Sequence, residues 1–316
     1  MIEALPGIND TVFHAPYLLG LVVSGLTLGA IYALMAISMV VTYRASSQLN
    51  FAQGEMGTLG AFVVFTLCVE HGQPYWLVIP VVMVLSLMFG AGVERGLIRP
   101  VERRGAHSVV IITLGLFLLL NAVTGIVWGV DPVTPVTPFP SGITDQWVIM
   151  AGPPRFAIRY SAVWIWGTVA VVTVALVLLM QRTRLGLSYR AAATNAESAS
   201  LVGIPVARMR MLGWGLAAAV GSLTAVLFAV QARSMDFQLM SGVLLFGLAA
   251  AALGGFDSIG GAVLGGLITG LVEMLVPALF TFIGAQLSQV MALLVIAVVL
   301  LVRPYGLFGS KPVERV

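Results

Sequence analysis

From Tyr17 to Tyr43 the chain reads YLLGLVVSGLTLGAIYALMAISMVVTY, without a single charged side chain. A helix of about 20 apolar residues is enough to cross the hydrocarbon core of a bilayer, and this run is longer. The rest of the chain is similar, because 59% of its 316 residues are hydrophobic and only 9% are charged. A soluble protein carries roughly a quarter charged residues, which it needs to cover its surface. The sequence therefore predicts an all-α integral membrane protein and excludes a soluble globule with a large core.

Nine apolar stretches are long enough to be spans. They are residues 17–43, 51–69, 75–98, 108–130, 161–180, 209–231, 237–254, 261–283 and 286–302. Short neighbouring segments can merge or re-enter, so eight to ten spans fit the pattern. No soluble domain separates from them, and residues 1–316 are predicted to form a single transmembrane domain. The first apolar stretch is too long for a signal peptide and follows no basic region, so we expect it to be retained.

The basic residues predict the orientation. With the N-terminus (residues 1–16) outside and the tail (residues 303–316) in the cytoplasm, thirteen of the sixteen Lys and Arg residues lie on the cytoplasmic side. These are Arg44, Arg95, Arg99, Arg103, Arg104, Arg182, Arg184, Arg190, Arg208, Arg210, Arg303, Lys311 and Arg315. Arg155, Arg159 and Arg233 remain outside. Cytoplasmic loops of membrane proteins are enriched in Lys and Arg, which favours this topology over the inverted one.

Two connections are long. The outer one, residues 131–160, is rich in proline between Asp131 and Gly142, so we expect an extended, semi-rigid segment that serves as a spacer or as a docking surface. The inner one, residues 181–210, has Leu185, Ala192, Ala196, Ala199 and Val202 at helical spacing among arginines. It predicts a short amphipathic helix that ends at Gly203 to Pro205 and rests on lipid or on a partner protein.

Glycine pairs four residues apart predict close helix packing. Small residues at this spacing let two helix backbones approach in a membrane, where burial of apolar side chains provides no driving force. The pairs are Gly25 and Gly29, Gly261 and Gly265, and Gly266 and Gly270.

Several kinds of chemistry are missing. The only lysine, Lys311, is not part of a phosphate-binding loop of the form GxxxxGK[ST], so ATP hydrolysis by that route is excluded. The spans hold no Ser/His pair, paired aspartates or HExxH site for proteolysis. Cys68 is the only cysteine, and His14, His71 and His107 have no metal-ligand spacing. We expect no metal, no cofactor and no enzymatic activity in this chain.

Few polar groups are predicted at membrane depth, and ionisable groups there usually face a cavity or a partner. Asn50, Gln53 and Glu55 lie together at the beginning of the second predicted span, and Asn121 and Glu273 lie within later ones. Gly54 and Gly57 are expected to loosen the helix, which predicts a broken or re-entrant start of that span. Glu55 is interpreted either as part of a pathway or as a satisfied carboxylate near the cytoplasmic edge. For Glu273 a structural role is favoured.

At these residues the sequence resembles the branched-chain amino acid permeases of ABC transporters, the LivH type. The matching segments, in order, are GLTLGAIYAL (25–34), NFAQGE (50–55), LGAF (59–62), Glu94 to Pro100, Thr113 to Gly115, Arg182 to Gly186, Arg190 and Ala191, Ala199 to Ile204, Arg208, GGFDSIGGA (254–262) and RPYGLFG (303–309). Two positions depart from the family pattern, which commonly has histidine where Gln53 stands and glycine near Asp257.

The resemblance implies an importer subunit in a bacterial inner membrane. Its partners would be a second permease subunit of the LivM type, two cytoplasmic ATPases that hold ATP and Mg, and an extracytoplasmic solute-binding protein. Residues 184–204 would couple the chain to an ATPase, with Arg184 and Arg190 as surface charges, Asn195 and Glu197 as polar contacts and Gly203 as the stop. The implied coupling residues are Arg184, Gly186, Arg190, Asn195, Glu197, Ala199, Gly203 and Ile204, and the implied pathway residues are Tyr32, Asn50, Gln53, Glu55, Thr113 and Asn121.

The implied mechanism is alternating access, and a pathway with few charges suits a zwitterion or a small amide. Branched-chain amino acids are the first candidates, and urea, short amides and sugars are alternatives within the same class. A stand-alone secondary transporter is the rival class, although only Glu55 and Glu273 could serve as an acidic relay for ion coupling. A membrane scaffold is a third reading.

Overall fold

The computed structural model describes residues 15–102, 105–135, 137, 145–150, 156–280, 288–303 and 306–308. The long helices are α1 (Ala15–Ser46), α3 (Tyr75–Val93), α5 (Ala106–Trp128), α6 (Tyr160–Arg182), α9 (Val206–Ala232) and α11 (Ile259–Leu279). The shorter helices are α2 (Gln53–Phe65), α4 (Arg99–Glu102), α7 (Arg184–Thr194), α8 (Ala196–Leu201), α10 (Ser241–Gly254) and α12 (Ser288–Val302). Two π-helical turns, η2 (Thr66–Glu70) and η3 (Glu94–Ile98), extend α2 and α3.

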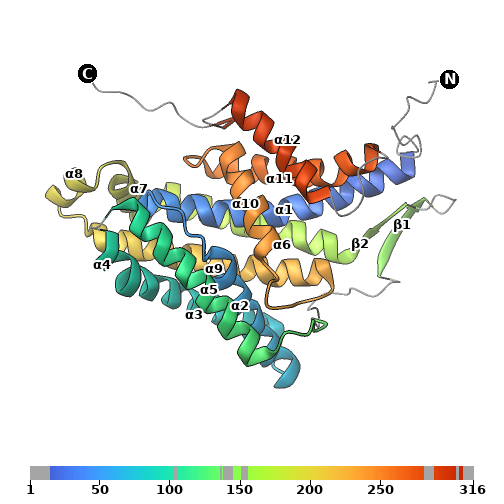
Figure 1. Ribbon diagram of the computed structural model, residues 1–316, viewed down its shortest axis with the longest axis horizontal. Helices are drawn as coiled ribbons and strands as arrows, with labels where there is room; N and C mark the ends of the chain where they lie inside the picture. The colour runs from blue at the N-terminus through green and yellow to red at the C-terminus, as the bar shows by residue number, and fades with distance from the viewer. Residues whose placement is uncertain are drawn as a thin grey trace.

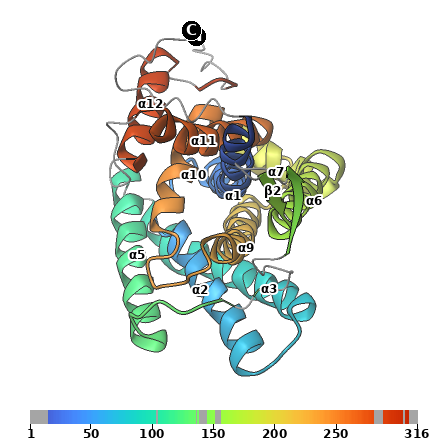
Figure 2. The same ribbon diagram turned by 90° about the vertical axis from the view of Figure 1, so that its right-hand side faces the viewer.

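The helices form one bundle around α9 and α1 (Figures 1 and 2). Helix α9 packs against α1, α2 and α3, and its apolar window is 89% buried. Glycine and alanine line much of α9, from Gly213 to Ala229, which lets the neighbouring helices approach closely. The core of the molecule is therefore built from small residues on the central helices rather than from large side chains alone.

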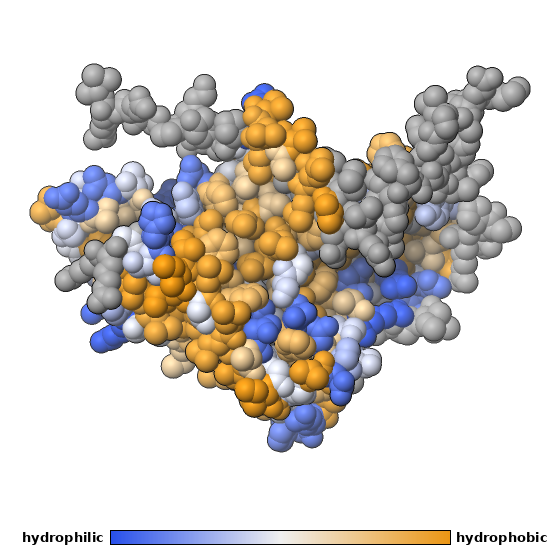
Figure 3. Space-filling view, in the orientation of Figure 1, coloured by the Kyte–Doolittle hydropathy of each residue, from blue (hydrophilic) through white to orange (hydrophobic). Residues whose placement is uncertain are grey.

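Six helices in the described part of the chain are long and apolar enough to cross a membrane. They are the six long helices, and α3 continues through η3 and α4. The other three predicted stretches hold the shorter helices α2, α10 and α12. The outward faces of α3, α5 and α6 are strongly apolar, as Trp76, Ile126 and Val171 show with 78%, 83% and 68% exposure. Figure 3 shows such apolar residues over much of the viewed face. A surface of this kind needs lipid around it, so the chain is a multi-pass membrane protein.

Two of the shorter helices, α2 and α10, begin inside the bundle. The Gln53 side chain, in the first turn of α2, donates a hydrogen bond to the carbonyl of Ala217 at 2.7 Å, near the middle of the 27-residue α9. Gly54 packs against Met240 and Leu244 at the start of α10. Helix α10 has 14 residues, and α2 has 13 and continues through the 5 residues of η2. They are about 21 and 27 Å long, less than the ~30 Å of a hydrocarbon core. Because both begin inside the bundle and beside each other, we call them half-helices.

The break before α2 lies elsewhere than predicted. Gly54 and Gly57 are inside the regular helix, where an added Cβ at Gly57 would come within 2.7 Å of the Gly221 carbonyl oxygen. These glycines do not loosen the helix; they allow α2 to pack on α9. The non-helical backbone is the preceding segment, residues 47–52, which begins with a left-handed residue, Ser47, at φ 55°.

A short antiparallel hairpin follows α5 and was not predicted. Its strands are β1 (Gln146–Met150) and β2 (Phe156–Arg159), with Trp147 paired to Ile158. It forms the part of residues 131–160 next to α6, whereas half of the proline-rich segment from Asp131 to Gly142 (residues 136 and 138–142) lies outside the described residues. Of that segment, Val133 pairs with Met235 through two backbone hydrogen bonds of 2.8 and 2.9 Å. Among the described residues, the regular structure is thus helical apart from this hairpin and the Val133–Met235 bridge.

Candidate functional site

A polar cluster lies where α2 and α10 begin. Its centre is Glu55 in the first turn of α2, whose side chain has no exposed surface. Asn121 of α5, Ser241 of α10 and Asp236 of the preceding loop lie beside it. Asn121 and Ser241 lie close enough to be hydrogen-bonding neighbours of Glu55, although neither carboxylate oxygen accepts a hydrogen bond of ideal geometry within the described part of the chain. A buried carboxylate is costly unless polar groups surround it, so this cluster of polar side chains is a candidate site.

Asn50 and Gln53 hold the non-helical segment before α2 in place. The Asn50 amide donates to the Gln53 side-chain oxygen at 3.0 Å, and its own oxygen accepts from the Ala52 backbone N–H at 3.0 Å. Gln53 then donates to the Ala217 carbonyl of α9. Both side chains are buried with their polar groups satisfied. They position the first turn of α2, and with it Glu55.

Asn121 connects this cluster to the loop before α10. Its amide donates to the Phe237 carbonyl at 3.1 Å, which joins α5 to the loop before α10. Thr113, on the same helix, is fully buried, but its hydroxyl donates to the Val110 carbonyl of its own helix. The structure therefore brings Asn121 to the cluster and does not connect Thr113 to it by a hydrogen bond.

Tyr32 belongs to a different contact. Its hydroxyl donates to Glu273 Oε2 at 2.6 Å between α1 and α11, and its ring stacks on Phe246 with centroids 5.1 Å apart. Glu273 thus has one well-formed hydrogen bond, whereas Glu55 lies among the polar side chains of Asn121, Ser241 and Asp236. The sequence missed Asp236 and Ser241, since the predicted span 237–254 placed them at its boundary. The signal available for them was the polar composition of residues 231–241 between two apolar stretches.

The inner connection forms two helices instead of the one predicted. Asn195 leaves the helical conformation at φ −154° and caps α8 by accepting the Ser198 N–H at 2.9 Å. Because of this break, Leu185 and Val202 do not share one apolar face, and both are exposed. Leu201 and Val202 are 82% and 76% exposed at the end of α8, which Figure 1 shows at one extremity of the molecule.

Helix α7 is anchored to the membrane bundle. Tyr189 is buried, and its hydroxyl donates to the Val41 carbonyl of α1. Burial raises the pKa of Tyr189, so it stays a neutral donor. Gly186 lies so close to α6 that an added Cβ would be 2.3 Å from the Leu179 carbonyl oxygen. The segment is held at α7 and exposed at α8.

The remaining predicted coupling residues divide between these two parts. Arg184, Asn195, Glu197 and Gly203 are exposed, Arg190 and Ile204 are partly buried, and Ala199 is buried. Gly203 has φ +84°, which favours glycine, and it ends α8 as predicted from the sequence. The Ile204 N–H donates to the Ala199 carbonyl at 3.0 Å and closes the turn.

The six glycines predicted to pack helices lie at backbone contacts. An added Cβ at Gly29 would be 2.8 Å from Leu267 Cα, and one at Gly270 would be 2.3 Å from the Gly29 nitrogen. The equivalent positions at Gly25, Gly261, Gly265 and Gly266 meet backbone atoms at 3.0, 2.1, 2.1 and 2.4 Å. Helices α1, α10 and α11 therefore approach one another at distances that leave no room for a side chain.

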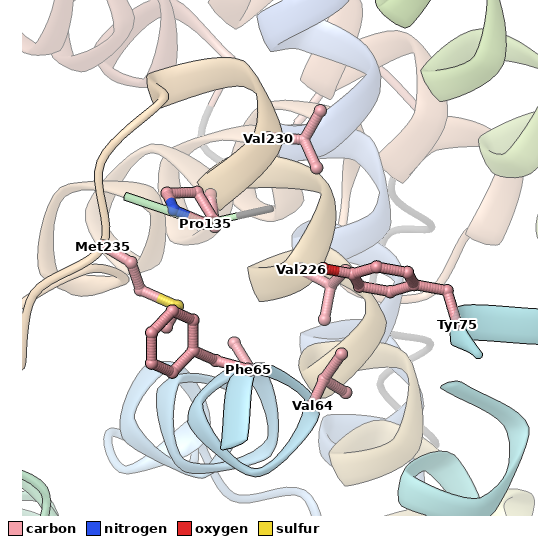
Figure 4. A pocket seen from close by; sticks show the side chains of 9 residues that line it. Val64, Phe65, Tyr75, Pro135, Val226, Val230 and Met235 are labelled. Carbon is pink, nitrogen blue, oxygen red and sulfur yellow. The ribbon is translucent and has the colours of Figure 1, made fainter. Parts of the chain in front are cut away.

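A separate pocket lies between α2, α9 and the loop that follows α9 (Figure 4). Its labelled side chains include Val64, Phe65, Val226 and Met235, and apart from Tyr75 its lining is apolar. Such a pocket cannot orient a polar solute by hydrogen bonds, so we assign it to packing. No group of three or more His, Cys, Asp or Glu residues that could hold a metal ion occurs among the described residues.

These features define a class of protein: a multi-pass membrane protein whose buried polar cluster is built from half-helices, with an exposed helical connection at one end. The chain belongs to the family of the branched-chain amino acid transport system permease component, whose model matches residues 21–302. It is thus a transporter permease subunit by family.

Relatives match over nearly the whole chain. The high-affinity branched-chain amino acid transport system permease protein LivH of Escherichia coli (strain K12) is 30% identical, covering 95% of this chain and 98% of the relative. The corresponding BraD protein of Pseudomonas aeruginosa is 31% identical, covering 93% and 96%. A xylose/arabinose import permease of Sulfolobus acidocaldarius is 28% identical over 58% of this chain and 48% of its own. No solved structure is significantly similar to this chain.

Proposed function

We propose that this chain is the translocation subunit of a binding-protein-dependent ABC importer for branched-chain amino acids or similar small polar solutes. The names of the near-full-length relatives support the solute class. The structural observation that carries the proposal is the buried cluster of Asn50, Gln53 and Glu55 at the start of two half-helices. Non-helical backbone at membrane depth is tolerated where it is buried in protein or lines a cavity, and half-helices at this depth are typical of solute sites in transporters.

The proposed pathway passes the junction of α2, α5 and α10. Glu55 and Asn121 face the solute, while Asn50 and Gln53 hold the backbone around it. The pathway opens to one side at a time. The family resemblance also implies Tyr32 and Thr113 as pathway residues. Their hydrogen bonds lie outside this cluster, so we assign both residues to helix packing.

ATP and Mg are proposed to bind to partner subunits. Two cytoplasmic ATPases press on α7 and α8, where exposed Leu201 and Val202 supply apolar contact and Arg184 and Glu197 supply charge. A second permease subunit of the LivM type completes the pathway, and an extracytoplasmic binding protein delivers the solute on the side of β1 and β2. The complex resides in a bacterial inner membrane, with nine spans, the N-terminus outside and the C-terminus inside.

Reconstitution of the complete complex tests this function. The chain is co-expressed with its neighbouring transporter subunits, purified by a tag on this chain and placed in liposomes with ATP inside and binding protein outside. We expect ATP-dependent leucine uptake and leucine-stimulated ATP hydrolysis. The same liposomes with urea or xylose distinguish the alternative solutes. Uptake by this chain alone, driven by a proton gradient without ATPase, would instead establish the stand-alone secondary transporter.

The coupling role has its own variant. Gly203→Val places a β-branched residue at φ +84°, which costs about 1–2 kcal/mol of conformational free energy. We expect the strain to change the direction of the chain at the end of α8. We expect ATP hydrolysis to continue while uptake is lost, with the subunit still in the membrane. Gly105→Val is the matched control, because Gly105 is also left-handed, at φ +106°, in a turn that is not part of α7 or α8. Normal uptake by the Gly203 variant would overturn the coupling assignment.

A further inference from the structure

A groove runs along α1 between α6 and α11. Both helices pack on α1 but have almost no contact with each other, and Figure 2 shows α1 between them. Small side chains of α1, Ala30 and Ala33, form the floor, and Trp166 of α6 and Leu267 of α11 form part of the walls. The groove holds about 370 Å³. One turn of an α-helix, about 10 Å across and 5.4 Å long, occupies about as much, so the groove fits a thinner chain than a helix.

The groove lies at membrane depth and opens sideways. Ala30 and Ala33 are near the middle of the 32-residue α1. Val174, which lines the groove on α6, is exposed, and so are Leu264 and Ile268 on the neighbouring turns of α11. Empty space in a protein costs stability, and a cavity lined by apolar side chains does not hold water. Since its rim faces the bilayer, the groove is suited to an apolar chain from the membrane.

Trp166 brings a hydrogen-bond donor into this apolar groove. Its indole Nε1 is buried and has no acceptor among the described residues, although a buried indole N–H normally has one. The Thr173 hydroxyl in the groove also lacks a partner, but a rotation about χ1 lets it donate to the carbonyl of Val169, four residues earlier. An indole has no such alternative. Trp166 therefore requires an acceptor from the occupant of the groove.

A polar pocket of about 320 Å³ lies where the same two helices meet the hairpin. Its lining includes Thr27 of α1 and Ala162 of α6, each one turn from the groove, together with Arg159 and Gln146 of the hairpin. Arg159 is exposed, and the like charge of Arg233 acts on it. Two neighbouring positive charges favour an anion. The groove thus has an apolar part and, next to it, a cationic part.

We propose that the groove binds one anionic phospholipid of the membrane: an acyl chain lies along Ala30 and Ala33, a glycerol ester carbonyl accepts the Trp166 N–H, and the phosphate lies beside Arg159. Seven residues separate Arg159 from Trp166, about 10 Å along a helix, which is close to the thickness of one headgroup layer, about 5–8 Å. Charge complementarity favours phosphatidylglycerol over zwitterionic phosphatidylethanolamine. This site goes beyond the proposed transport function and does not depend on the solute.

Native mass spectrometry of the purified, delipidated full chain in detergent tests the site. The chain is titrated with phosphatidylglycerol and with phosphatidylethanolamine of the same acyl chains. We expect the first phosphatidylglycerol to bind about 5-fold more tightly, the effect of one basic residue beside an anionic head group. Equal affinities would overturn the anionic head group. Displacement of the lipid by inorganic phosphate at the same concentration would show a simple anion site and would also overturn the proposal.

Three variants separate the parts of the site. Ala170→Phe fills the groove from α6 and should weaken both lipids at least about 10-fold, the loss of about two buried methylene groups. Ala175→Phe is the matched control, because Ala175 is also exposed on α6 but does not line the groove. Arg159→Gln should remove only the preference for phosphatidylglycerol. Trp166→Phe should weaken both lipids about equally, roughly 5-fold, because both contain the ester.

Phosphatidylglycerol binding as tight as that of the wild type in both Ala170→Phe and Arg159→Gln overturns the site. The complete complex, purified in mild detergent, provides a second measurement that needs no variant. We expect it to retain phosphatidylglycerol. A complex that retains none, although the chain alone binds it, would show that another subunit covers the groove, and the proposal would be wrong. None of these measurements uses a transported solute, so their failure would leave the proposed function untouched.

Discussion

Two buried acidic residues in the membrane region have opposite surroundings. Glu273 accepts a hydrogen bond of good geometry from Tyr32, whereas Glu55 lies among the polar side chains of Asn121, Ser241 and Asp236. Since a buried polar group is stable only when it is satisfied, the Tyr32–Glu273 pair is a structural link between α1 and α11. Glu55 lies in the polar cluster that we propose to line the pathway. The sequence around each glutamate does not predict this difference, because the neighbouring polar side chains come from helices that are distant in the sequence.

Tyr32→Phe should therefore affect stability. The substitution leaves the Glu273 carboxylate buried without its donor, and we expect a loss of about 1–3 kcal/mol, seen as a lower Tm in detergent by tryptophan fluorescence. Tyr32→Phe combined with Glu273→Met removes both polar groups and should regain most of that loss. An unchanged Tm in the single variant, together with weakened leucine binding, would contradict the structural role and would indicate that Tyr32 lines the pathway.

At the glycine contacts, a single methyl group is expected to separate helices. An added Cβ at Gly266 of α11 would lie 2.4 Å from the Ala33 nitrogen of α1 and 2.5 Å from its Cα, whereas one at Gly20 of α1 meets nothing within 4 Å. Gly266→Ala should cost about 1–3 kcal/mol as an overpacked contact. Gly20→Ala should change Tm little or raise it slightly, because alanine favours helix. Equal Tm values for the two variants would show that α1 and α11 are farther apart than described.

At the scale of the elements, the proposed coupling role requires that α7 stay attached to α1. Its attachment includes Tyr189, whose hydroxyl donates to the Val41 carbonyl. Tyr189→Phe removes that bond and keeps the ring, so we expect normal amounts of folded complex and a several-fold lower number of leucine molecules taken up per ATP hydrolysed. Tyr17→Phe, at an exposed position near the other end of α1, is the control. Unaltered coupling in Tyr189→Phe would mean that the other contacts of α7 suffice.

The sequence predicts most of these elements, and its errors have physical causes. Hydropathy locates apolar segments and identifies the helices, but it does not record where backbone turns inside the membrane. Residues 237–240 are therefore assigned to a span, although α10 begins only at Ser241. The split at Asn195 also escapes a periodicity argument, since one capping side chain decides it. The predicted grouping of Asn50, Gln53 and Glu55 did locate the cluster, because neighbours in sequence remain neighbours at one helix terminus.

For the whole molecule, the distribution of charge and apolar surface points to one arrangement in the membrane. Exposed apolar side chains surround the bundle, with Ile126 and Val171 as examples. Arginines gather near α7 and α8 and the start of α9, where Arg210 pairs with Glu102 and Arg99 with Glu94. Few basic residues lie by the hairpin. Because positive charge is retained on the cytoplasmic side, α7 and α8 should face the ATPases and β1 and β2 the outside.

This orientation can be tested with single cysteines in a Cys68→Ser background. A membrane-impermeant maleimide should label Ile149→Cys on β1 in intact cells, and should label Thr194→Cys on α7 only after permeabilisation, since both positions are exposed. Val171→Cys, which is 68% exposed on α6, should resist the reagent in both conditions because lipid covers it. Labelling of Thr194→Cys in intact cells would invert the topology and remove α7 and α8 from the reach of any cytoplasmic ATPase.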